Sequence, residues 1–357
     1  RAKNDEFYTQ YGDIQKEIGA YLEYNPDVFR NKVVYCNCDD PFESNFFRYF
    51  VLNFNKLGLK QLITTSYKPS PVANTQLTLF GDDKTLTKSK GLPAGRHGRP
   101  KINANKFIIN EVADIDDDGE FNLKDIAKQL KANKHNEWMP LEGDGDFRSD
   151  ECINLLKQSD IVITNPPFSL FRQYLKQLVE YEKKFLIIGN MNAITYKEVF
   201  PLIKDNKMWL GNGFHAGNAY FFTPNMRDFA SGVYDEKTGL VKFRNVCWFT
   251  NIDHGRRHQP LKQMTMEENL KYSKHKEIKG KKSYDKYDNY DAIEVPFTDS
   301  IPSDYDGVMG VPISFLDKYN PEQFEIVKFR HGDDEKDLRL KDGICPYFRV
   351  LIKHKKK

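Results

Sequence analysis

The stretch SDIVITNPPFSLF, residues 159–171, joins an apolar run to two consecutive prolines. Proline fixes its φ angle and lacks a backbone donor, so neither a β-ladder nor a helix continues through Pro166 and Pro167. The result is a rigid corner with two hydrogen-bond acceptors, the side-chain oxygen of Asn165 and the carbonyl oxygen of Pro166. Phe168 follows directly. This corner suits a flat ring that carries an amino group, because the acceptors can bind both N–H hydrogens while the phenyl ring stacks.

The exocyclic amino group of adenine is a chemical group that needs such a corner. Its nitrogen is a poor nucleophile, because the lone pair is delocalised into the ring. Two fixed acceptors that bind both hydrogens favour a tetrahedral nitrogen and make the lone pair available for attack. Fixed dipoles can provide this stabilisation without a titrating base. We therefore expect Asn165, Pro166, Pro167 and Phe168 to form a catalytic corner.

The elements around this corner alternate between strands and helices. This alternation predicts an α/β fold with a mostly parallel, doubly wound sheet that is covered by helices on both faces. Predicted helices cover residues 44–58, 123–134, 150–158 and 169–184. Predicted strands cover residues 32–38, 60–67, 106–114, 138–144, 160–164, 185–190 and 207–212.

Polar corners follow three of the predicted strands. Asp39 and Asp40 follow the first, the stretch Asp144-Gly145-Asp146-Phe147 closes another, and Asn165 follows a third. Ligands of α/β sheets bind at the carboxyl ends of the strands, so we expect a site at this edge. A different interpretation of Asp144 and Asp146 is that one of them caps the helix at 150–158.

No metal site is predicted. Cys36 and Cys38 lie in an apolar strand and are interpreted most simply as small buried residues. The stretch from Asp114 to Gly119 resembles the start of a calcium loop, but Asp125 stands where such a loop requires glutamate. The five cysteines show no disulfide spacing, which favours a reducing compartment.

The charge of the chain is balanced overall but uneven along its length. The net charge of its 357 residues is only +3, and 39% of them are hydrophobic. Residues 84–101 carry six Lys or Arg and no acid, residues 271–286 carry seven Lys against two acids, and the chain ends in KHKKK. Each of these segments is either a solvated surface or part of a basic face that binds a polyanion.

No apolar run reaches the roughly 20 residues that a membrane span needs, and the first residues, RAKNDEFYTQ, show no apolar signal region. We therefore expect no membrane partner and a cytoplasmic location.

Six stretches together resemble the EcoRI-type adenine-specific DNA methyltransferases, which use S-adenosylmethionine. The resemblance covers most of the chain from Asp5 to about Lys353, except for residues 68–105, which are interpreted as an insertion. It implies the methyltransferase type of doubly wound sheet, duplex DNA as partner, no metal requirement and a prokaryotic or phage source. It leaves open whether a cognate restriction endonuclease accompanies the enzyme. The stretches are DEFYTQY, VVYCNCDDP, EGDGDFRSDECINLLKQSDIVITNPPFSLF, ITYKEVF, YDNYDAIEV and DYDGVMGVPISFL.

The resemblance also implies roles for individual residues. The segment with Asp5, Phe7 and Tyr8 is expected to lie against the methionine end of the cofactor. The stretch with Cys36, Asp39 and Asp40 replaces the usual glycine-rich loop, and Asp146 with Phe147 is expected to bind the cofactor adenine. Asn165 completes the expected cofactor-binding set. The second strand, LITTSYKP, lacks the acid that usually binds the ribose, so this contact has no assigned residue.

The order of these motifs predicts two domains. Residues 1–212 are expected to form the catalytic domain, and residues 213–357 the rest of the sheet and a C-terminal target-recognition region. The basic part of the insertion contains GRHGRPK, whose spacing resembles that of short Arg-Gly-Pro arms that enter narrow minor grooves, although a plain surface loop has the same composition. The residues expected to bind DNA there are Lys88, Lys90, Arg96, Arg99 and Lys101.

Three other functions share parts of this pattern. Protein glutamine methyltransferases also use an Asn-Pro-Pro corner, usually followed by Tyr where this chain has Phe168. RNA adenine methyltransferases need the same amine chemistry. A catalytically inactive DNA-binding relative would keep the fold alone. DNA adenine methylation is preferred because the basic insertion and the large C-terminal region accompany an intact corner.

Overall fold

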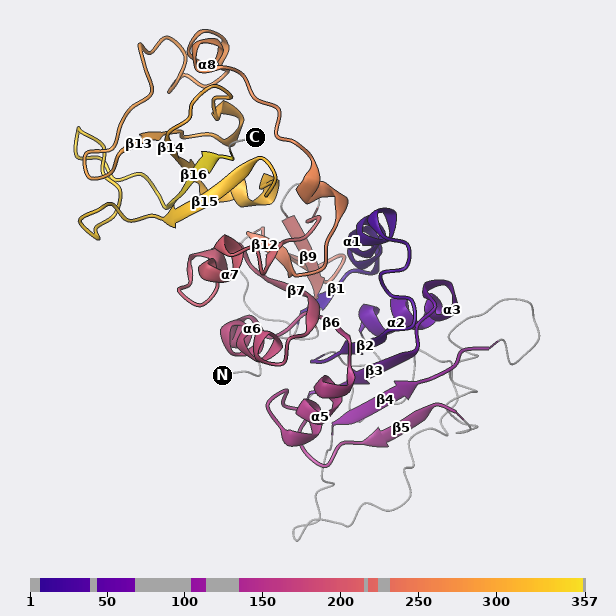
Figure 1. Ribbon diagram of the computed structural model, residues 1–357. Helices are drawn as coiled ribbons and strands as arrows, with labels where there is room; N and C mark the ends of the chain where they lie inside the picture. The colour runs from indigo at the N-terminus through magenta and orange to yellow at the C-terminus, as the bar shows by residue number, and fades with distance from the viewer. Residues whose placement is uncertain are drawn as a thin grey trace. The chain divides into compact units, whose positions relative to one another are not determined.

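The computed structural model describes residues 7–38, 44–67, 104–113, 135–214, 218–223 and 232–355. The chain forms two compact units. Unit 1 comprises residues 1–191 and 211–252, and unit 2 comprises residues 192–210 and 253–357 (Figure 1). Asp5, Asp39, Asp40 and the predicted DNA-binding residues Lys88, Lys90, Arg96, Arg99 and Lys101 lie outside the described residues.

Unit 1 is built on a mixed sheet whose strands run in the order β5-β4-β3-β2-β6-β7-β12. The four central strands, β3, β2, β6 and β7, are parallel to one another. Strands β4, β5 and β12 pair antiparallel at the flanks. The bounds are β2 Val33–Cys36, β3 Gln61–Thr65, β4 Asn105–Ile109, β5 Glu137–Pro140, β6 Ile161–Thr164, β7 Lys184–Asn190 and β12 Val246–Thr250.

Alternate residues of the central strands pack against helices on opposite faces. Val34 belongs to a core cluster with Ile18 of α1 and Phe50 of α2, while its neighbour Tyr35 interacts with Cys152 of α5 on the other face. Figure 1 shows α1, α2 and α3 on one side of the sheet and α5 and α6 on the other. The bounds are α1 Tyr11–Tyr24, α2 Asn45–Leu52, α3 Phe54–Leu57, α5 Asp150–Gln158 and α6 Phe171–Glu180.

The described elements confirm most of the predicted positions, while the predicted helix at 123–134 and most of the insertion at 68–105 lie outside the described residues. The predicted helix at 44–58 is divided into α2 and α3, and the strand predicted at 138–144 ends at Pro140. The sheet is mixed where a mostly parallel one was expected, because the apolar pattern of residues 106–114 identifies a strand without giving its direction. The helical pattern of residues 169–184 predicts that Tyr174, Leu175, Leu178 and Val179 share one apolar face. The first three are buried in α6, but Val179 is 41% exposed. The apolar stripe of this helix is therefore narrower than the sequence suggests.

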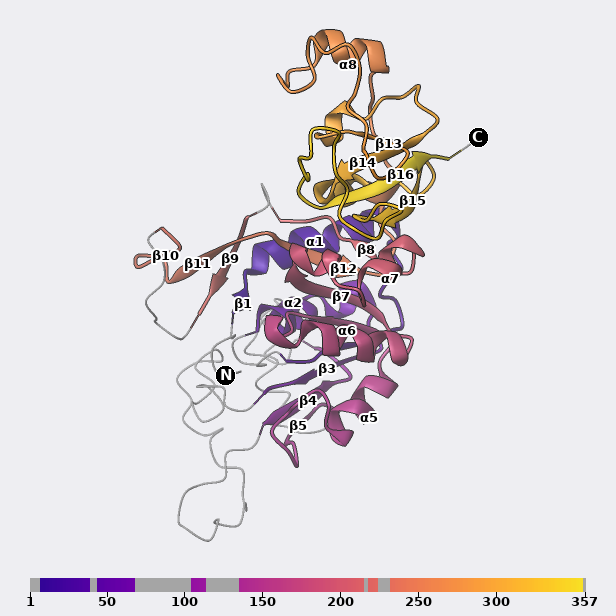
Figure 2. The ribbon, with the colours of Figure 1, turned by 90° about the vertical axis from the view of Figure 1, so that its left-hand side faces the viewer.

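A second sheet in unit 1 brings the N-terminal segment beside distant parts of the chain. All its pairings are antiparallel, in the order β1-β9-β11-β10, with Tyr8 opposite Phe222. Figure 2 shows β9, β11 and β10 side by side. This sheet positions Phe7, the residue before β1. The bounds are β1 Tyr8–Thr9, β9 Asn218–Phe222, β10 Tyr234–Asp235 and β11 Leu240–Arg244.

Unit 2 contains a four-stranded sheet in the order β13-β14-β16-β15, in which only β13 and β14 are parallel. Glu294 of β13 and Arg349 of β16 form a buried ion pair, with an N···O distance of 2.7 Å. The Tyr287 hydroxyl donates to the same carboxylate. The bounds are α7 Phe200–Lys204, β8 Trp209–Leu210, α8 Met266–Tyr272, β13 Ala292–Glu294, β14 Val308–Pro312, β15 Phe324–Phe329 and β16 Arg349–His354.

Within the described ranges, no helix is both long and apolar enough to cross a membrane. The same part of the chain contains no group of three or more His, Cys, Asp or Glu side chains that could hold a metal ion.

Gly189 of β7 fixes how closely α6 approaches the sheet. A Cβ atom at this position would lie 2.5 Å from Cε2 of Phe171, the first residue of α6. We expect Gly189→Ala to lower the free energy of unfolding by about 1–3 kcal/mol, because the added methyl overpacks the contact. Gly143→Ala is the matched control, since a Cβ atom there meets nothing within 4 Å. Urea denaturation measures both variants, and equal stability of the two would contradict the packing argument.

Candidate active site

The Asn165 side chain has a fixed orientation at the end of β6. Its Nδ2 atom donates a hydrogen bond of 2.7 Å to the backbone oxygen of Phe7. Because a carbonyl oxygen can only accept, this contact identifies the nitrogen and leaves Oδ1 as the remaining polar atom. Oδ1 is buried and has no hydrogen-bond partner among the described residues. A buried acceptor without a partner is unfavourable, so this atom is available for an N–H donor from a ligand.

Phe168, the last residue of the proline corner, belongs to a cluster of aromatic rings. The Phe168 ring stacks on Phe7, with centroids 6.5 Å apart and planes 29° apart, and meets Phe243 edge-on at 6.1 Å. Phe243 also lies 4.6 Å from Phe7 and 5.5 Å from Phe221. Phe168 itself is only half-buried. The cluster holds this ring in place while part of its surface stays accessible beside Asn165.

Hydrogen bonds between polar side chains connect the carboxyl ends of three of the four central strands, β2, β3 and β6. The Thr164 hydroxyl donates to the backbone oxygen of Asn37, and the Thr65 hydroxyl donates to the Asn37 side chain at 3.1 Å. Tyr35 bonds to Thr65 at 3.1 Å, and burial raises its pKa, so its hydroxyl stays protonated at neutral pH. This network was not predicted from the sequence, although an Asn and two Thr at the strand ends were its signal.

The Gly145 turn brings residues 144–147 close to the end of β3. Gly145 has φ +78°, and a Cβ atom there would lie 1.9 Å from the backbone oxygen of Ser66, so only glycine fits. The N-cap of α5 is Ser149, whose Oγ accepts from the Cys152 amide at 3.3 Å. The interpretation of Asp144 or Asp146 as the helix cap is therefore wrong.

Arg148 holds the Asp146 carboxylate. Its Nε and Nη2 atoms donate to the two carboxylate oxygens at 2.9 and 2.6 Å. These hydrogen bonds lower the pKa of Asp146, so the group is ionised at neutral pH. The Asp146 side chain keeps 20% of its surface exposed. Part of this carboxylate, which is paired with Arg148, thus remains accessible at this corner.

Helix α6 connects this corner with the proline corner. The Phe147 ring is buried and packs edge-on against Tyr174 at 4.9 Å. Gln177 donates to the Phe147 backbone oxygen at 3.1 Å, and Arg148 donates to Gln173 at 3.0 Å. Since α6 begins just after Phe168, the two corners share one helix as their support.

The remaining predicted residues have different surroundings. Phe7 lies directly at Asn165, whereas Tyr8 is buried in β1, with its ring 6.4 Å from Phe222. Cys36 is fully buried in β2 within the core cluster of unit 1. The structure thus brings Phe7, Asn165 and Phe168 together and places Cys36 in the hydrophobic interior.

The donors and acceptors at the two corners fit a cofactor such as S-adenosylmethionine. Its amino groups and ribose hydroxyls need acceptors, and Asp146 is an ionised, accessible carboxylate. The tight turn at Gly145 lets the backbone approach a ligand closely. The Asn165 oxygen, which has no partner among the described residues, fits the amine of the substrate.

Comparisons with known proteins agree with this chemistry. The family described as "Adenine-specific methyltransferase EcoRI" matches residues 1–355. The Type II methyltransferase M.EcoRI of Escherichia coli is 46% identical over 359 residues, which cover 100% of this chain and 95% of the relative. Those of Mycoplasma pneumoniae (M.MpnI, 32%) and Mycoplasma genitalium (M.MgeORF184P, 33%) each align with 99% of this chain and 96% of their own length.

No solved structure is significantly similar to the chain. The full-length matches to the family and to these relatives decide the assignment. The chain belongs to the family of EcoRI-type adenine-specific methyltransferases, and it is accordingly a DNA adenine methyltransferase that uses S-adenosylmethionine.

Proposed function

We propose that the chain methylates the N6 amino group of an adenine that is flipped out of a specific duplex DNA sequence, with Asn165, Pro166, Pro167 and Phe168 as the catalytic corner. The observation that carries this proposal is the Asn165 amide, whose nitrogen is held by Phe7 while its buried oxygen has no described partner. A stacked base is out of reach of such a corner, so flipping is required, at a cost of about a few kcal/mol.

In this proposal the chain activates the amine by orientation alone. Asn165 Oδ1 accepts one N6 hydrogen and the Pro166 carbonyl accepts the other, which favours a tetrahedral nitrogen. The half-buried Phe168 ring stacks on the adenine and keeps the amino group in the plane of both acceptors. S-adenosylmethionine, when bound, supplies an electrophilic methyl group. The proton leaves after transfer, so no titrating base of the chain has to act before it.

The residues proposed to hold the cofactor come from three segments. Asp146 and Phe147 lie in the turn between β5 and α5. The ionised carboxylate of Asp146 supports a role as acceptor for the cofactor. Phe7 and Tyr8, with Asp5, are proposed for the methionine end, and Cys36, Asp39 and Asp40 for the loop after β2. Cys36 is buried, so its contribution is to place the following residues.

The finer architecture also belongs to the proposal. Helices on both faces of a sheet with four parallel central strands support the doubly wound methyltransferase type. We assign residues 1–212 to catalysis, since both corners lie there, and residues 213–357 to the rest of the sheet and target recognition. The basic insertion at 68–105 is proposed to contact duplex DNA, in a reaction without a metal and in the cytoplasm.

Replacing the amide of Asn165 tests the catalytic proposal. We expect Asn165→Ala to lower the turnover number at least about a hundredfold, because one of two preorganised acceptors is lost. Affinity for S-adenosylmethionine should stay within about threefold of the original. Transfer of a labelled methyl group to unmethylated bacterial DNA measures turnover, and calorimetric titration measures cofactor affinity.

Asn45→Ala is a matched control, because the Asn45 amide also donates to a backbone oxygen of the N-terminal segment, that of Thr9, at 2.7 Å. This control should keep turnover within about tenfold. Near-normal DNA methylation by the Asn165 variant would refute the mechanism. Parallel reactions with RNA and with protein extract identify the substrate, and preferential labelling of either would refute DNA as the substrate.

Removing the charge at Asp146 tests the cofactor assignment. We expect Asp146→Asn to weaken S-adenosylmethionine binding by about tenfold to a hundredfold, the usual loss for a hydrogen bond to a charged group. Affinity for duplex DNA should change little. Asp150→Ala provides the control, since Asp150 is an exposed residue in the first turn of α5. Equal cofactor affinity of the two variants would contradict this assignment and would leave Asp146 only its ion pair with Arg148.

A further inference from the structure

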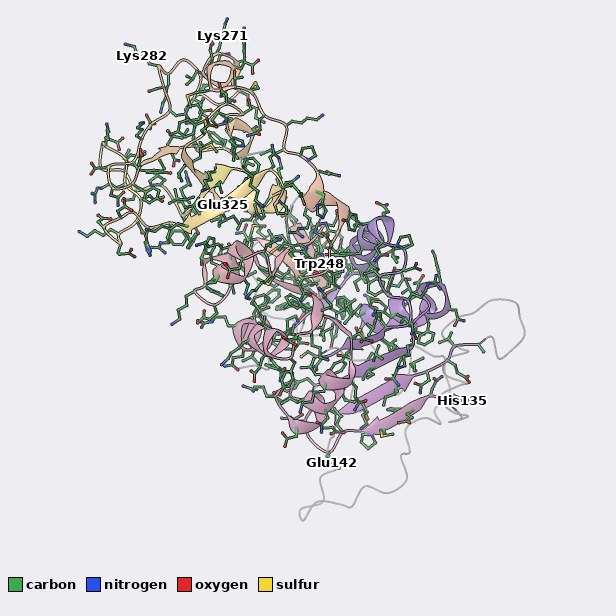
Figure 3. All side chains as sticks on the ribbon, viewed as in Figure 1. His135, Glu142, Trp248, Lys271, Lys282 and Glu325 are labelled. Atoms are coloured by element: carbon green, nitrogen blue, oxygen red, sulfur yellow. The ribbon has the colours of Figure 1, made fainter. Side chains whose placement is uncertain are left out.

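A segment of unit 2 displays lysines on an ordered scaffold. It begins in the last turn of α8 and runs from Lys271 to Lys282, with Glu277 as its only acid. Figure 3 shows Lys271 and Lys282 extending outward from the same end of the unit. We define the basic surface as the four exposed lysines of this segment that form no ion pair with a described residue. These are Lys271, Lys276, Lys279 and Lys282.

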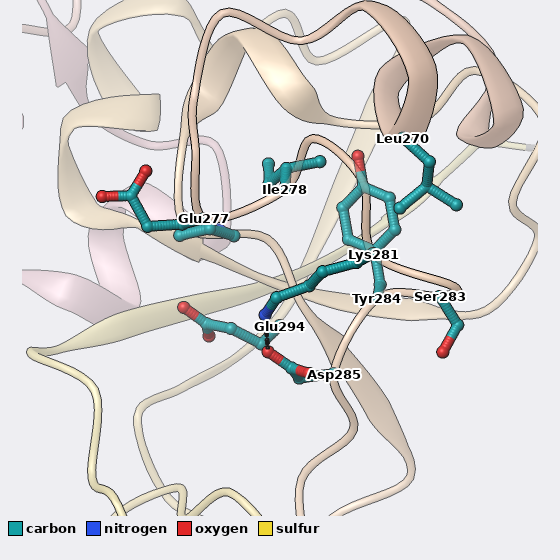
Figure 4. Close-up of a pocket in the computed structure, with 9 residues that line it drawn as sticks. Leu270, Glu277, Ile278, Lys281, Ser283, Tyr284, Asp285 and Glu294 are labelled. Atoms are coloured by element: carbon teal, nitrogen blue, oxygen red, sulfur yellow. Dashed lines mark hydrogen bonds and ion pairs between the residues drawn. The ribbon is translucent and has the colours of Figure 1, made fainter.

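The segment is fixed by its own backbone and by buried side chains. The Gly280 amide donates to the Leu270 oxygen at 2.8 Å, which folds the chain back onto α8, and the Lys279 amide donates to the His275 oxygen at 2.9 Å. Ile278 is 2% exposed, and Figure 4 shows it beside Leu270 and Tyr284. The segment is therefore a folded support for its lysines, and binding a ligand would not require ordering a loose loop.

Three nearby acids, Asp285, Asp299 and Glu294, are already paired with other side chains. Asp285 pairs with Lys281 at 2.5 Å, the contact drawn as a dashed line in Figure 4. Asp299 pairs with Lys274 at 2.7 Å and with His275 at 2.8 Å, and the His275 ring stacks on Phe297. Glu294 is bound by Arg349. These three acids therefore do not offset the basic surface. Glu267 and Glu277 are exposed and have no ion pair with a described residue, but they balance only part of its four positive charges.

An exposed aromatic ring accompanies these charges. Tyr272 is 61% exposed, and the Lys271 ammonium lies 5.1 Å from its ring centroid. Four cations on one folded segment of twelve residues repel one another, and a polyanion with regularly spaced charges relieves this repulsion. The phosphate backbone of duplex DNA is such a polyanion, with one negative charge per about 1.7 Å of its axis.

We infer that the basic surface of unit 2 binds the phosphate backbone of duplex DNA. This inference rests on the proposed function, which makes duplex DNA the substrate, and it adds a contact outside the basic insertion. Phosphate contacts position a protein on the duplex without reading its sequence, so the surface contributes affinity rather than specificity. Loss of the surface should therefore raise the KM for DNA and leave the turnover number at saturating DNA unchanged.

The test compares two triple variants of the full chain. The surface variant is Lys276→Gln, Lys279→Gln and Lys282→Gln. The control variant is Lys286→Gln, Lys336→Gln and Lys341→Gln, three exposed lysines from an acidic region of the same unit. Lys286 and Lys341 line an open hollow together with Asp288, Asp291, Asp333 and Asp334.

Fluorescence anisotropy with a labelled duplex gives the DNA affinity between 50 and 200 mM salt. Each lost phosphate contact should reduce the slope of log affinity against log salt by about 0.9, so the surface variant should lose about 2 to 3 in slope. Raising the salt from 50 to 200 mM then lowers the DNA affinity of both proteins, but the factor of loss is about 40 times smaller for the surface variant than for the original chain. The control variant should keep the original slope.

An unchanged slope in the surface variant, or an equal loss in both variants, overturns the inference. A surface variant that loses affinity for single-stranded RNA but keeps it for duplex DNA also overturns it. Methylation by the unaltered chain, measured in the same preparation, tests the proposed function separately. Normal methylation combined with an unchanged slope would refute phosphate binding by the basic surface and leave the proposed function intact.

Discussion

The hydrogen bond from the Asn165 amide nitrogen to the Phe7 carbonyl oxygen is the contact on which the site depends. It commits the nitrogen to the protein and leaves the oxygen as a buried acceptor. Strand β1 holds the Phe7 backbone by pairing with β9, and the rings of Phe168 and Phe243 enclose the Phe7 side chain. Without this contact the amide could rotate, and its dipole would no longer be preorganised for an amine.

Helix α6 also contacts the second corner, the one that contains Asp146, Phe147 and Arg148. Its first residue, Phe171, packs where Gly189 leaves room on β7, and its side chains Gln173 and Gln177 reach the Asp146–Arg148 corner. This helix therefore supports both the proline corner, which directly precedes it, and the carboxylate proposed for the cofactor.

The proline corner could be predicted from the sequence because its cause is local: two prolines end a strand wherever they occur. The partner of Asn165 could not, because Phe7 lies far away in the chain and pairing with β9 brings it there. Strand direction was equally hidden, since the apolar pattern of β4 is the same in either direction. The polar network at Asn37, Thr65 and Thr164 likewise depends on which strands are neighbours.

The central claim is that the Asn165 oxygen accepts a hydrogen bond from the amino group of the target base. A crystal structure of the chain with its duplex DNA substrate and S-adenosylhomocysteine tests this most directly. We expect a flipped adenine whose N6 atom lies about 2.7–3.2 Å from Asn165 Oδ1, with the Asn165 nitrogen still bonded to Phe7. An Asn165 oxygen bonded to another protein group, or an adenine held elsewhere, would contradict the account.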